Sequence, residues 1–323
     1  MATYKGIQGY SVQKLSSDPT ASEADGQLWY NSSSAKFKLG TAGTGAWASG
    51  GALNTARRGI AVGGAGARDS ALSISGDSPS KSEVEAYDGT SWTEKTDVST
   101  ARANAAAAGT QTAALLISGN PASPLVEQWN GASWTEVGDV TNGRVESAGT
   151  GTVTAALIMS GSTSPQALVE EYNGVAWSAA GALTSAAHKT CQSAGTTTAA
   201  LCGGGYAAPP YTAGTLVEEY NGTSWTANPA QNNGTSSAGG AGTSTSAMHF
   251  GGAPYPVVKT EVFNGTSWTE VANLGTAASL GGGVGANSSA ALFFGGNVGP
   301  PTDTTQTQEW ADPVYSIKTV TVS

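Results

Sequence analysis

The chain has 323 residues, of which 11% are charged, and its formal net charge is −9. This acidic balance disfavours nucleic-acid binding, which needs a basic surface, and the regular recurrence of aromatic residues disfavours a disordered chain. With 45 glycines and 39% hydrophobic residues, the composition suits one large all-β domain of thin, glycine-turned strands.

Residues 1–45 precede the regular part of the chain and are expected to form an N-terminal extended arm that contains a hairpin. Residues 3–13 alternate weakly, as in a strand, and residues 27–39 read as a hairpin with a long loop. The start lacks the basic region and apolar core of a signal peptide, and no apolar run reaches membrane-spanning length. We therefore expect synthesis inside the cell and no membrane insertion.

From residue 46 onward one hairpin recurs, and its clearest copy is residues 217–226, in which Asn-Gly separates Tyr220 from Trp225. Asn-Gly is typical of a two-residue type I′ turn, because both turn residues need positive φ. Such a turn places Tyr220 opposite Thr223, with Tyr220 and Trp225 on the same face of the sheet. The other copies run from Tyr87 to Trp92, Trp129 to Trp134, Tyr172 to Trp177 and Phe263 to Trp268, with a worn copy from Trp310 to Tyr315.

Each repeat also contains an Ala/Gly-rich strand and a nearly continuous apolar strand that ends in a pair of small residues. Continuous apolar runs indicate burial on both faces. Four strands per repeat, with tryptophans 42 to 48 residues apart, are typical of propeller blades. The apolar strands are predicted at residues 71–76, 113–119, 155–161, 199–204, 247–252 and 290–296.

The order of small pair, Val-Glu-x-Tyr, turn, Trp and Arg resembles the kelch repeat over residues 47–315. The resemblance implies an all-β, kelch-like β-propeller at 46–323 with six four-stranded blades. The ring would be closed by the Trp47 strand or by the C-terminal strand at 314–322. A seventh blade built from residues 1–39 is the alternative.

Arginine lies ten residues after the first three tryptophans of the series, and glutamate recurs at one position of the third strand. We expect these glutamates to be spread around the disc and satisfied by backbone donors or by arginine, rather than paired for catalysis. In later repeats Ala187, Thr235 and Ala278 replace arginine, so any Arg–Glu brace there is expected to be lost. The residues concerned are Arg57, Arg102 and Arg144, and Glu85, Glu127, Glu170, Glu218 and Glu261.

No catalytic residue, metal site or cofactor is predicted, and the protein is expected not to be an enzyme. His188 and His249 occupy different strand positions and would not converge, so we interpret them as structural or solvent-exposed histidines rather than metal ligands. Cys191 and Cys202 are expected to be small buried residues, and whether they are bonded stays open. They would face each other across strands if the hairpin centre lies between residues 196 and 197.

The candidate binding residues lie on the rim loops between the second and third strands. Stiff proline-rich loops that present tyrosine bind with little ordering cost, and tyrosine rings suit sugars or protein surfaces. The predicted binding residues are Tyr206, Pro209, Tyr211, Tyr255 and Asp303.

The N-terminal segment, with Gly-Gln-Leu-Trp-Tyr-Asn at residues 26–31, resembles bacteriophage structural and tail-fibre proteins, especially those of marine phages. The resemblance implies a virion protein, made in the host cytoplasm, that displays a propeller to host surface glycan or protein or to other virion subunits. A homo-oligomer is left open. A soluble bacterial kelch-type interaction module and a glycan-active enzyme are the alternatives. The predicted attachment residues are Tyr4, Ile7, Tyr10, Trp29 and Tyr30.

Overall fold

The computed structural model describes residues 12–19, 26–42, 45–61, 65–77, 79–186, 188–206, 212–254, 256–299, 302–312 and 315–321. The chain divides into two compact units. Residues 46–311 form the propeller unit, and residues 1–45 together with 312–323 form the terminal unit.

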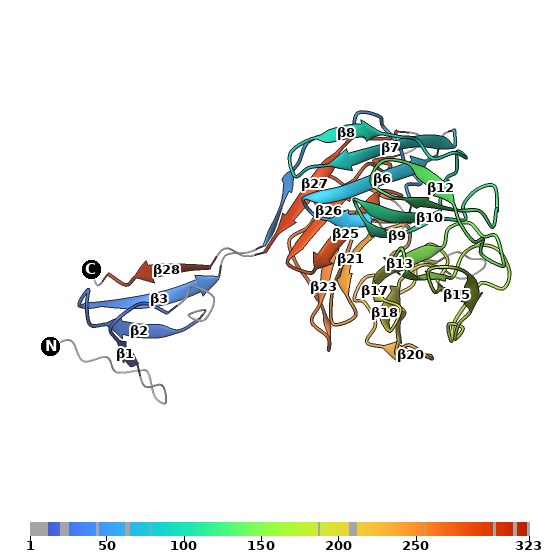
Figure 1. Cartoon of the computed structure of the whole chain (residues 1–323). Coiled ribbons are helices and arrows are strands. Elements are labelled where there is room, and N and C mark those ends of the chain that lie inside the picture. Colours follow the sequence, from blue (N-terminus) through green and yellow to red (C-terminus); the bar gives the residue numbers. More distant parts are fainter. Residues whose placement is uncertain are drawn as a thin grey trace. The chain divides into compact units, whose positions relative to one another are not determined.

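The prediction of an all-β propeller is confirmed, but the number of four-stranded sheets is seven rather than the expected six. Six of them lie in the propeller unit, and the seventh belongs to the terminal unit. In the propeller unit each sheet uses four strands in their chain order, except that β4 completes the last sheet beside β27 (Figure 1). Of the two ways to close the ring, the chain therefore uses the Trp47 strand.

Neighbouring strands of the six propeller sheets are antiparallel. Their bounds are β5 Ala65–Ala67, β6 Ser70–Gly76, β7 Lys81–Tyr87 and β8 Trp92–Lys95; β9 Ala106–Thr110, β10 Ala113–Ile117, β11 Val126–Trp129 and β12 Trp134–Glu136; β13 Ala148–Thr152, β14 Ala155–Met159, β15 Val169–Tyr172 and β16 Trp177–Ala179; β17 Gln192–Thr196, β18 Ala199–Gly203, β19 Val217–Tyr220 and β20 Trp225–Asn228; β21 Gly239–Thr243, β22 Ser246–Phe250, β23 Thr260–Phe263 and β24 Trp268–Glu270; and β25 Gly282–Asn287, β26 Ala290–Phe294, β27 Thr307–Ala311 and β4 Ala46–Ser49.

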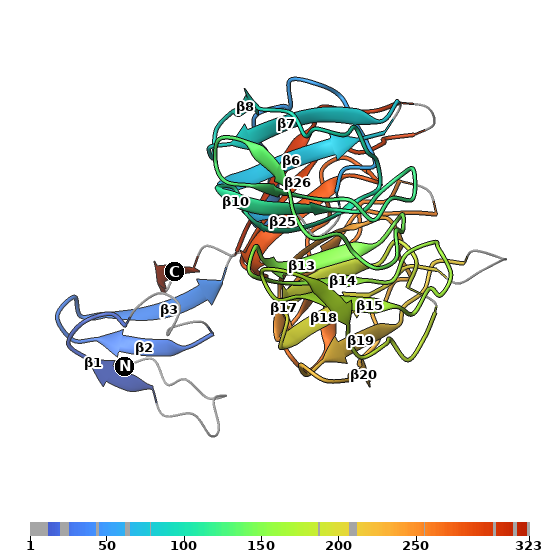
Figure 2. The same cartoon turned by 45° about the vertical axis from the view of Figure 1, so that its right-hand side comes forward.

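The sheet of the terminal unit joins the two ends of the chain, with β28 beside β3 (Figure 2). The expected second domain, 46–323, therefore loses its last strand to this unit, and residues 1–45 supply three sheet strands rather than only an arm with a hairpin. Strand β1 is parallel to β2, whereas the other two pairs are antiparallel. The strands are β1 Gln13–Leu15, β2 Leu28–Asn31, β3 Lys36–Ala42 and β28 Tyr315–Thr319.

The recurring hairpin has a four-residue loop, which corrects the predicted type I′ turn. Tyr220 pairs directly with Trp225 rather than with Thr223. Gly222 has positive φ while Asn221 does not. The Asn221 side-chain oxygen instead accepts hydrogen bonds from the backbone N–H groups of Thr223 and Ser224, at 3.0 Å each. The prediction that the two rings share a face is confirmed, because their centroids lie 5.0 Å apart.

The hydrophobic core lies between adjacent sheets. Trp129 and Trp134 pack against Leu72 and Val84 of the preceding sheet, and the same arrangement recurs around the unit. Trp92 packs against Phe294 of the last sheet, with ring centroids 4.9 Å apart. The aromatic repeat therefore forms the contact between successive sheets.

The hairpin between β17 and β18 is centred one residue later than expected. Thr196 pairs with Ala199, so Cys202 lies opposite Ser193 rather than Cys191. The two cysteines are nevertheless close, because Cys191 lies in the connection that enters β17.

Candidate binding face

One end of the propeller unit, here called the loop face, carries the connections between second and third strands and those between successive sheets. Alternating strand direction puts both sets at the same end. Isolated β-bridges join the two sets, for example Arg58 with Asp77 and Lys189 with Tyr206. These bridges fix the backbone of the loop face.

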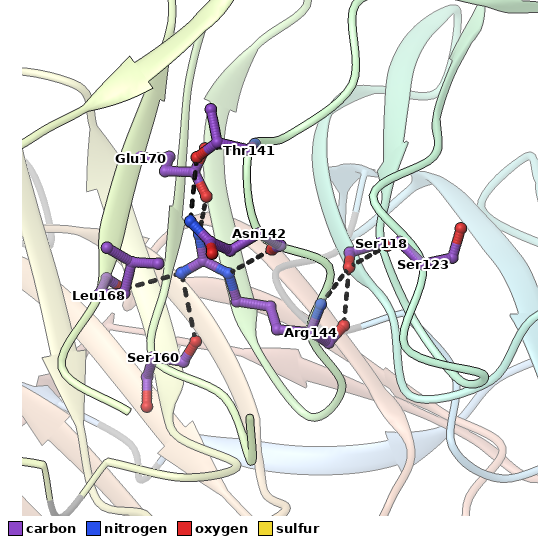
Figure 3. Close-up of polar contacts among 8 residues, drawn as sticks. All are labelled: Ser118, Ser123, Thr141, Asn142, Arg144, Ser160, Leu168 and Glu170. Atoms are coloured by element: carbon purple, nitrogen blue, oxygen red, sulfur yellow. Dashed lines mark hydrogen bonds and ion pairs between the residues drawn. The ribbon is translucent and has the colours of Figure 1, made fainter. Parts of the chain in front are cut away.

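Buried arginine and glutamate side chains hold the connections of the loop face against the sheets. Arg144 pairs with Glu170, and its Nη1 donates to the carbonyl oxygens of Leu168 at 2.8 Å and Ser160 at 3.4 Å (Figure 3). Glu170 accepts a further hydrogen bond of 2.7 Å from the backbone N–H of Thr141. Burial lowers the pKa of Arg144, while Glu170 acts to raise it. The ion pair therefore ties the connection that enters a sheet to the third strand of that sheet.

The prediction that these glutamates are satisfied by backbone donors and by arginine is confirmed. In every propeller sheet the same third-strand position accepts hydrogen bonds from the connection that enters the sheet, and in the last sheet Gln308 takes the role of glutamate. The pairs of acceptor and backbone donors are Glu85 with Asn54 and Thr55, Glu127 with Ser99 and Thr100, Glu170 with Thr141, Glu218 with Thr184 and Ser185, Glu261 with Asn232 and Asn233, and Gln308 with Gly275 and Thr276.

His188 is the side-chain partner of Glu218, at the position where the first three sheets have arginine. Its Nε2 lies 3.1 Å from Glu218 Oε1 and its Nδ1 2.9 Å from the Gly204 carbonyl oxygen. Burial acts to raise the pKa of Glu218, but hydrogen bonds from His188 and Thr184 outweigh it, so the pKa is lowered. The sequence predicted only the loss of the Arg–Glu pair in this sheet, and a histidine takes the place of arginine one residue after Ala187, which itself lies outside the described residues.

A closed ring of backbone hydrogen bonds surrounds the axis at the loop face. Each of its residues has φ between 51° and 61° and donates its N–H to the carbonyl oxygen of the equivalent residue in the preceding sheet, at 2.8 to 3.1 Å. The last bond runs from Gly59 N–H to Leu280 O, so the ring returns to its start. The ring residues are Gly59, Asn104, Glu146, Thr190, Ser237 and Leu280.

The ring nearly closes the axis at the loop face, where the hollow among its residues measures about 10 Å³. At the opposite end a recess of about 110 Å³ is lined by glycines from the first strands of all six sheets, including Gly109, Gly151 and Gly195. Access along the axis is therefore limited to the end away from the loop face.

Charged and aromatic side chains stand beside the ring. Arg58, which precedes Gly59, lies 3.4 Å from Asp303 Oδ1. Lys189, which precedes Thr190, lies 2.9 Å from Glu146 Oε2 and 5.2 Å from the centre of the Tyr206 ring. These side chains are only partly exposed, so they present charge and aromatic surface on a fixed backbone.

Two of the predicted binding residues, Tyr206 and Asp303, lie at the loop face as part of this arrangement. They belong to different groups of side chains, Tyr206 with Lys189 and Asp303 with Arg58. The other predictions, Pro209, Tyr211 and Tyr255, fall outside the described residues. Their binding role remains a prediction.

Sequence reasoning missed the ring residues and the cations beside them. A signal was present, because each ring residue stands two positions after Arg57, Arg102, Arg144 or the equivalent residue of a later repeat. Nothing in composition distinguishes these positions, since the hydrogen bonds use only the backbone. Their left-handed conformation appears only when the sheets are assembled.

In the terminal unit, Trp29 is buried and donates its indole N–H to Asp18 at 3.0 Å. Tyr30 is half-buried and packs edge-on against Phe37, with ring centroids 5.2 Å apart. Trp29 therefore supports its own sheet, while Tyr30 keeps part of its ring exposed. Tyr4, Ile7 and Tyr10 lie outside the described residues.

Among the described residues, no cluster of three or more His, Cys, Asp and Glu side chains is arranged to hold a metal ion. The part of the chain that the structure describes also contains no helix with the length and hydropathy of a membrane span.

No protein-family model matches the chain, and no curated protein matches it. Among solved structures, the chain is similar to one titled "Structure of YjhT", with a TM-score of 0.67 and 12% sequence identity. The match covers 83% of this chain and 99% of that chain. At this identity the similarity shows a shared fold, and it agrees with the propeller described above.

Proposed function

We propose that this protein is a non-enzymatic binding module of a bacteriophage particle, in which the loop face binds and the terminal unit attaches. The observation that carries the binding role is the group of charged and aromatic side chains around the closed ring. Rigid scaffolds that present such side chains on loops are common binding surfaces. Because the bridges hold the backbone in place, little conformational entropy is lost on binding.

The recurring carboxylates support a structural rather than a catalytic role for the buried charges. Each third-strand glutamate is committed to backbone donors of an entering connection. The kelch-like repeat supports a scaffold of this kind. Host surface glycan or protein, or another virion subunit, is the proposed partner of the loop face.

The attachment role rests on the terminal unit, which collects both chain ends in one sheet. A unit of this kind would connect the propeller unit to a larger particle through both of its termini. The resemblance of residues 26–31 to phage structural proteins supports a virion as that support.

The location is tested by mass spectrometry of purified phage particles from producing cells. We expect the protein among the particle components after density-gradient purification. Recovery only in the cytosolic fraction, bound to a bacterial protein, would contradict the virion proposal and favour a soluble interaction module.

The binding face is tested with the double variant Arg58→Ala, Lys189→Ala, which removes two loop-face cations. We expect binding of the labelled full-length protein to whole host cells to weaken by about tenfold or more, the effect of losing a binding hot spot. Val175→Ser is the control and should bind as the parent does, because Val175 is exposed in a hairpin turn at the other end of the sheets. Equal binding by parent and double variant would contradict the assignment of the loop face.

A further inference from the structure

The two cysteines of the chain meet inside the propeller unit. Cys191 and Cys202 are free and fully buried, and their sulfur atoms lie 2.7 Å apart. Non-bonded heavy atoms are most stable about 3.5–4.0 Å apart, and bonded sulfurs lie about 2.05 Å apart. The two sulfurs are thus closer than packing alone favours.

The repeat brings these two positions together. Cys191 directly follows ring residue Thr190, and Cys202 lies on the second strand. In the last sheet the equivalent residues are Gly281 and Phe293, and a side chain added at Gly281 would meet the Phe293 ring. The proximity of the two sulfurs therefore follows from the repeated backbone geometry.

In the other sheets the two positions carry residues of complementary or unlike size, and only the fourth sheet places a thiol at both. The corresponding pairs are Ile60 with Ser73, Ala105 with Leu116, Ser147 with Ile158, Ala238 with His249 and Gly281 with Phe293.

We propose that Cys191 and Cys202 form an intramolecular disulfide bond when the chain folds in the presence of a small disulfide oxidant such as oxidised glutathione. One cysteine thiolate attacks the oxidant and releases one glutathione thiol. The second cysteine then displaces the other glutathione from the mixed disulfide. The protein loses two protons and two electrons in total, and the oxidant becomes two glutathione molecules.

Burial decides when this exchange takes place. Both thiols are inaccessible in the folded unit, and burial raises the pKa of the Cys202 thiol well above its usual value, with Cys191 adding to the shift. The thiolate is the attacking species, so exchange is fast while the fourth sheet is still open and slow once it has closed. The finished bond is shielded from reductants for the same reason.

The bond would cross-link the hairpin of β17 and β18, whose sheet has His188 where the first three sheets have arginine. A disulfide stabilises mainly by restricting the unfolded chain, and for a loop of this length the folding equilibrium constant rises about 100-fold.

The experiment refolds the denatured, reduced full chain in buffer with either reduced or oxidised glutathione, followed by alkylation and intact-mass analysis. We expect the oxidised sample to lose the mass of two hydrogen atoms and to take up no alkylating reagent. It should also unfold at a higher urea concentration than the reduced sample. Two alkylated thiols, or two bound glutathiones, in a chain with native circular dichroism would overturn the proposal.

Two single variants are the controls, and each introduces the residue that an equivalent position already carries. Cys191→Ser corresponds to Ser147 and Cys202→Ser to Ser73. Both should fold, and neither should gain stability in oxidised glutathione. If either variant gained as much urea resistance as the parent, the stabilisation would not come from the bond.

Discussion

His249 shows how one residue adds pH dependence to a repeated position. Its ring is buried and stacks on Trp268 with centroids 4.5 Å apart, and Gln231 donates to its Nδ1. Burial lowers its pKa from 6.5 to about 3, because the charged ring would lose its hydration. The folded protein therefore holds His249 neutral while the unfolded chain protonates it below pH 6.5.

We predict that His249→Phe, which introduces the residue found at Phe293, makes stability less sensitive to acid. The contribution from neutral His249 is fully present above pH 6.5 and is lost as the pH falls toward 3. In this range the free energy of unfolding falls by about 1.4 kcal/mol for each pH unit. Between pH 6 and pH 5 the variant should therefore gain about that much relative to the parent.

The measurement is urea unfolding of both proteins at several pH values. The lost contact with Gln231 changes the free energy of unfolding of the variant by the same amount at every pH. The other titrating groups are common to both proteins. Parallel stability curves from pH 7 to pH 5 would contradict the assignment of a neutral buried His249.

At the scale of the sequence repeat, an aromatic residue before the turn and tryptophan after it specify a hairpin whose rings share a face. This much was predictable, because side-chain alternation depends only on strand geometry. The pairing register was not, since it depends on whether Asn221 adopts positive φ, and its side chain instead bonds two backbone N–H groups.

At the scale of the element, the sheets brace their entering connections in different ways. Arg102 pairs with Glu127 at 2.7 Å, His188 pairs with Glu218, and Gln308 acts opposite Ala278 without a cation. The shared requirement is an acceptor for backbone donors, and Glu261, opposite Thr235, meets it with hydrogen bonds from the backbone N–H groups of Asn232 and Asn233.

We predict that Arg102→Met destabilises the protein by about 3–5 kcal/mol, because it leaves the buried Glu127 carboxylate without its cation. Glu127→Gln in the same chain should recover part of that loss, since a neutral amide oxygen still accepts the backbone hydrogen bonds. Urea unfolding of the parent, both single variants and the double variant measures the coupling. Additive losses would contradict the brace.

At the scale of the whole molecule, the propeller unit closes on itself twice. Strand β4 pairs with β27 in the register of Trp47 with Trp310, and the ring of backbone hydrogen bonds returns to Gly59. Trp47 also packs edge-on against Phe250, with ring centroids 4.9 Å apart. Both closures use only residues of the propeller unit.

We predict that residues 46–311 fold without the terminal unit. Their melting temperature should stay within about 4 °C of the full chain, the shift that about 1 kcal/mol produces in a domain of this size. Removing β4 as well, by starting the fragment at Gly50, exposes the edge of β27 and should lower stability by about 3–5 kcal/mol or more, since it deletes Trp47.

Thermal unfolding followed by circular dichroism compares the two fragments with the full chain. Trp47→Ala in the full chain separates the effect of losing the Trp47 indole from the effect of losing strand β4. A fragment of residues 46–311 that fails to fold, or one starting at Gly50 that matches it, would contradict closure by β4.

By itself the sequence determined the all-β class, the strand order within a repeat and the shared face of the paired aromatic rings, because turn chemistry and side-chain periodicity are local. The tertiary structure alone decided that β28 pairs with β3 and that His188 stands in for arginine. It also decided that Lys189 and Arg58 flank a closed ring. These features join residues far apart in the chain through backbone groups that every residue carries, so residue type gives no sign of them until the sheets are assembled.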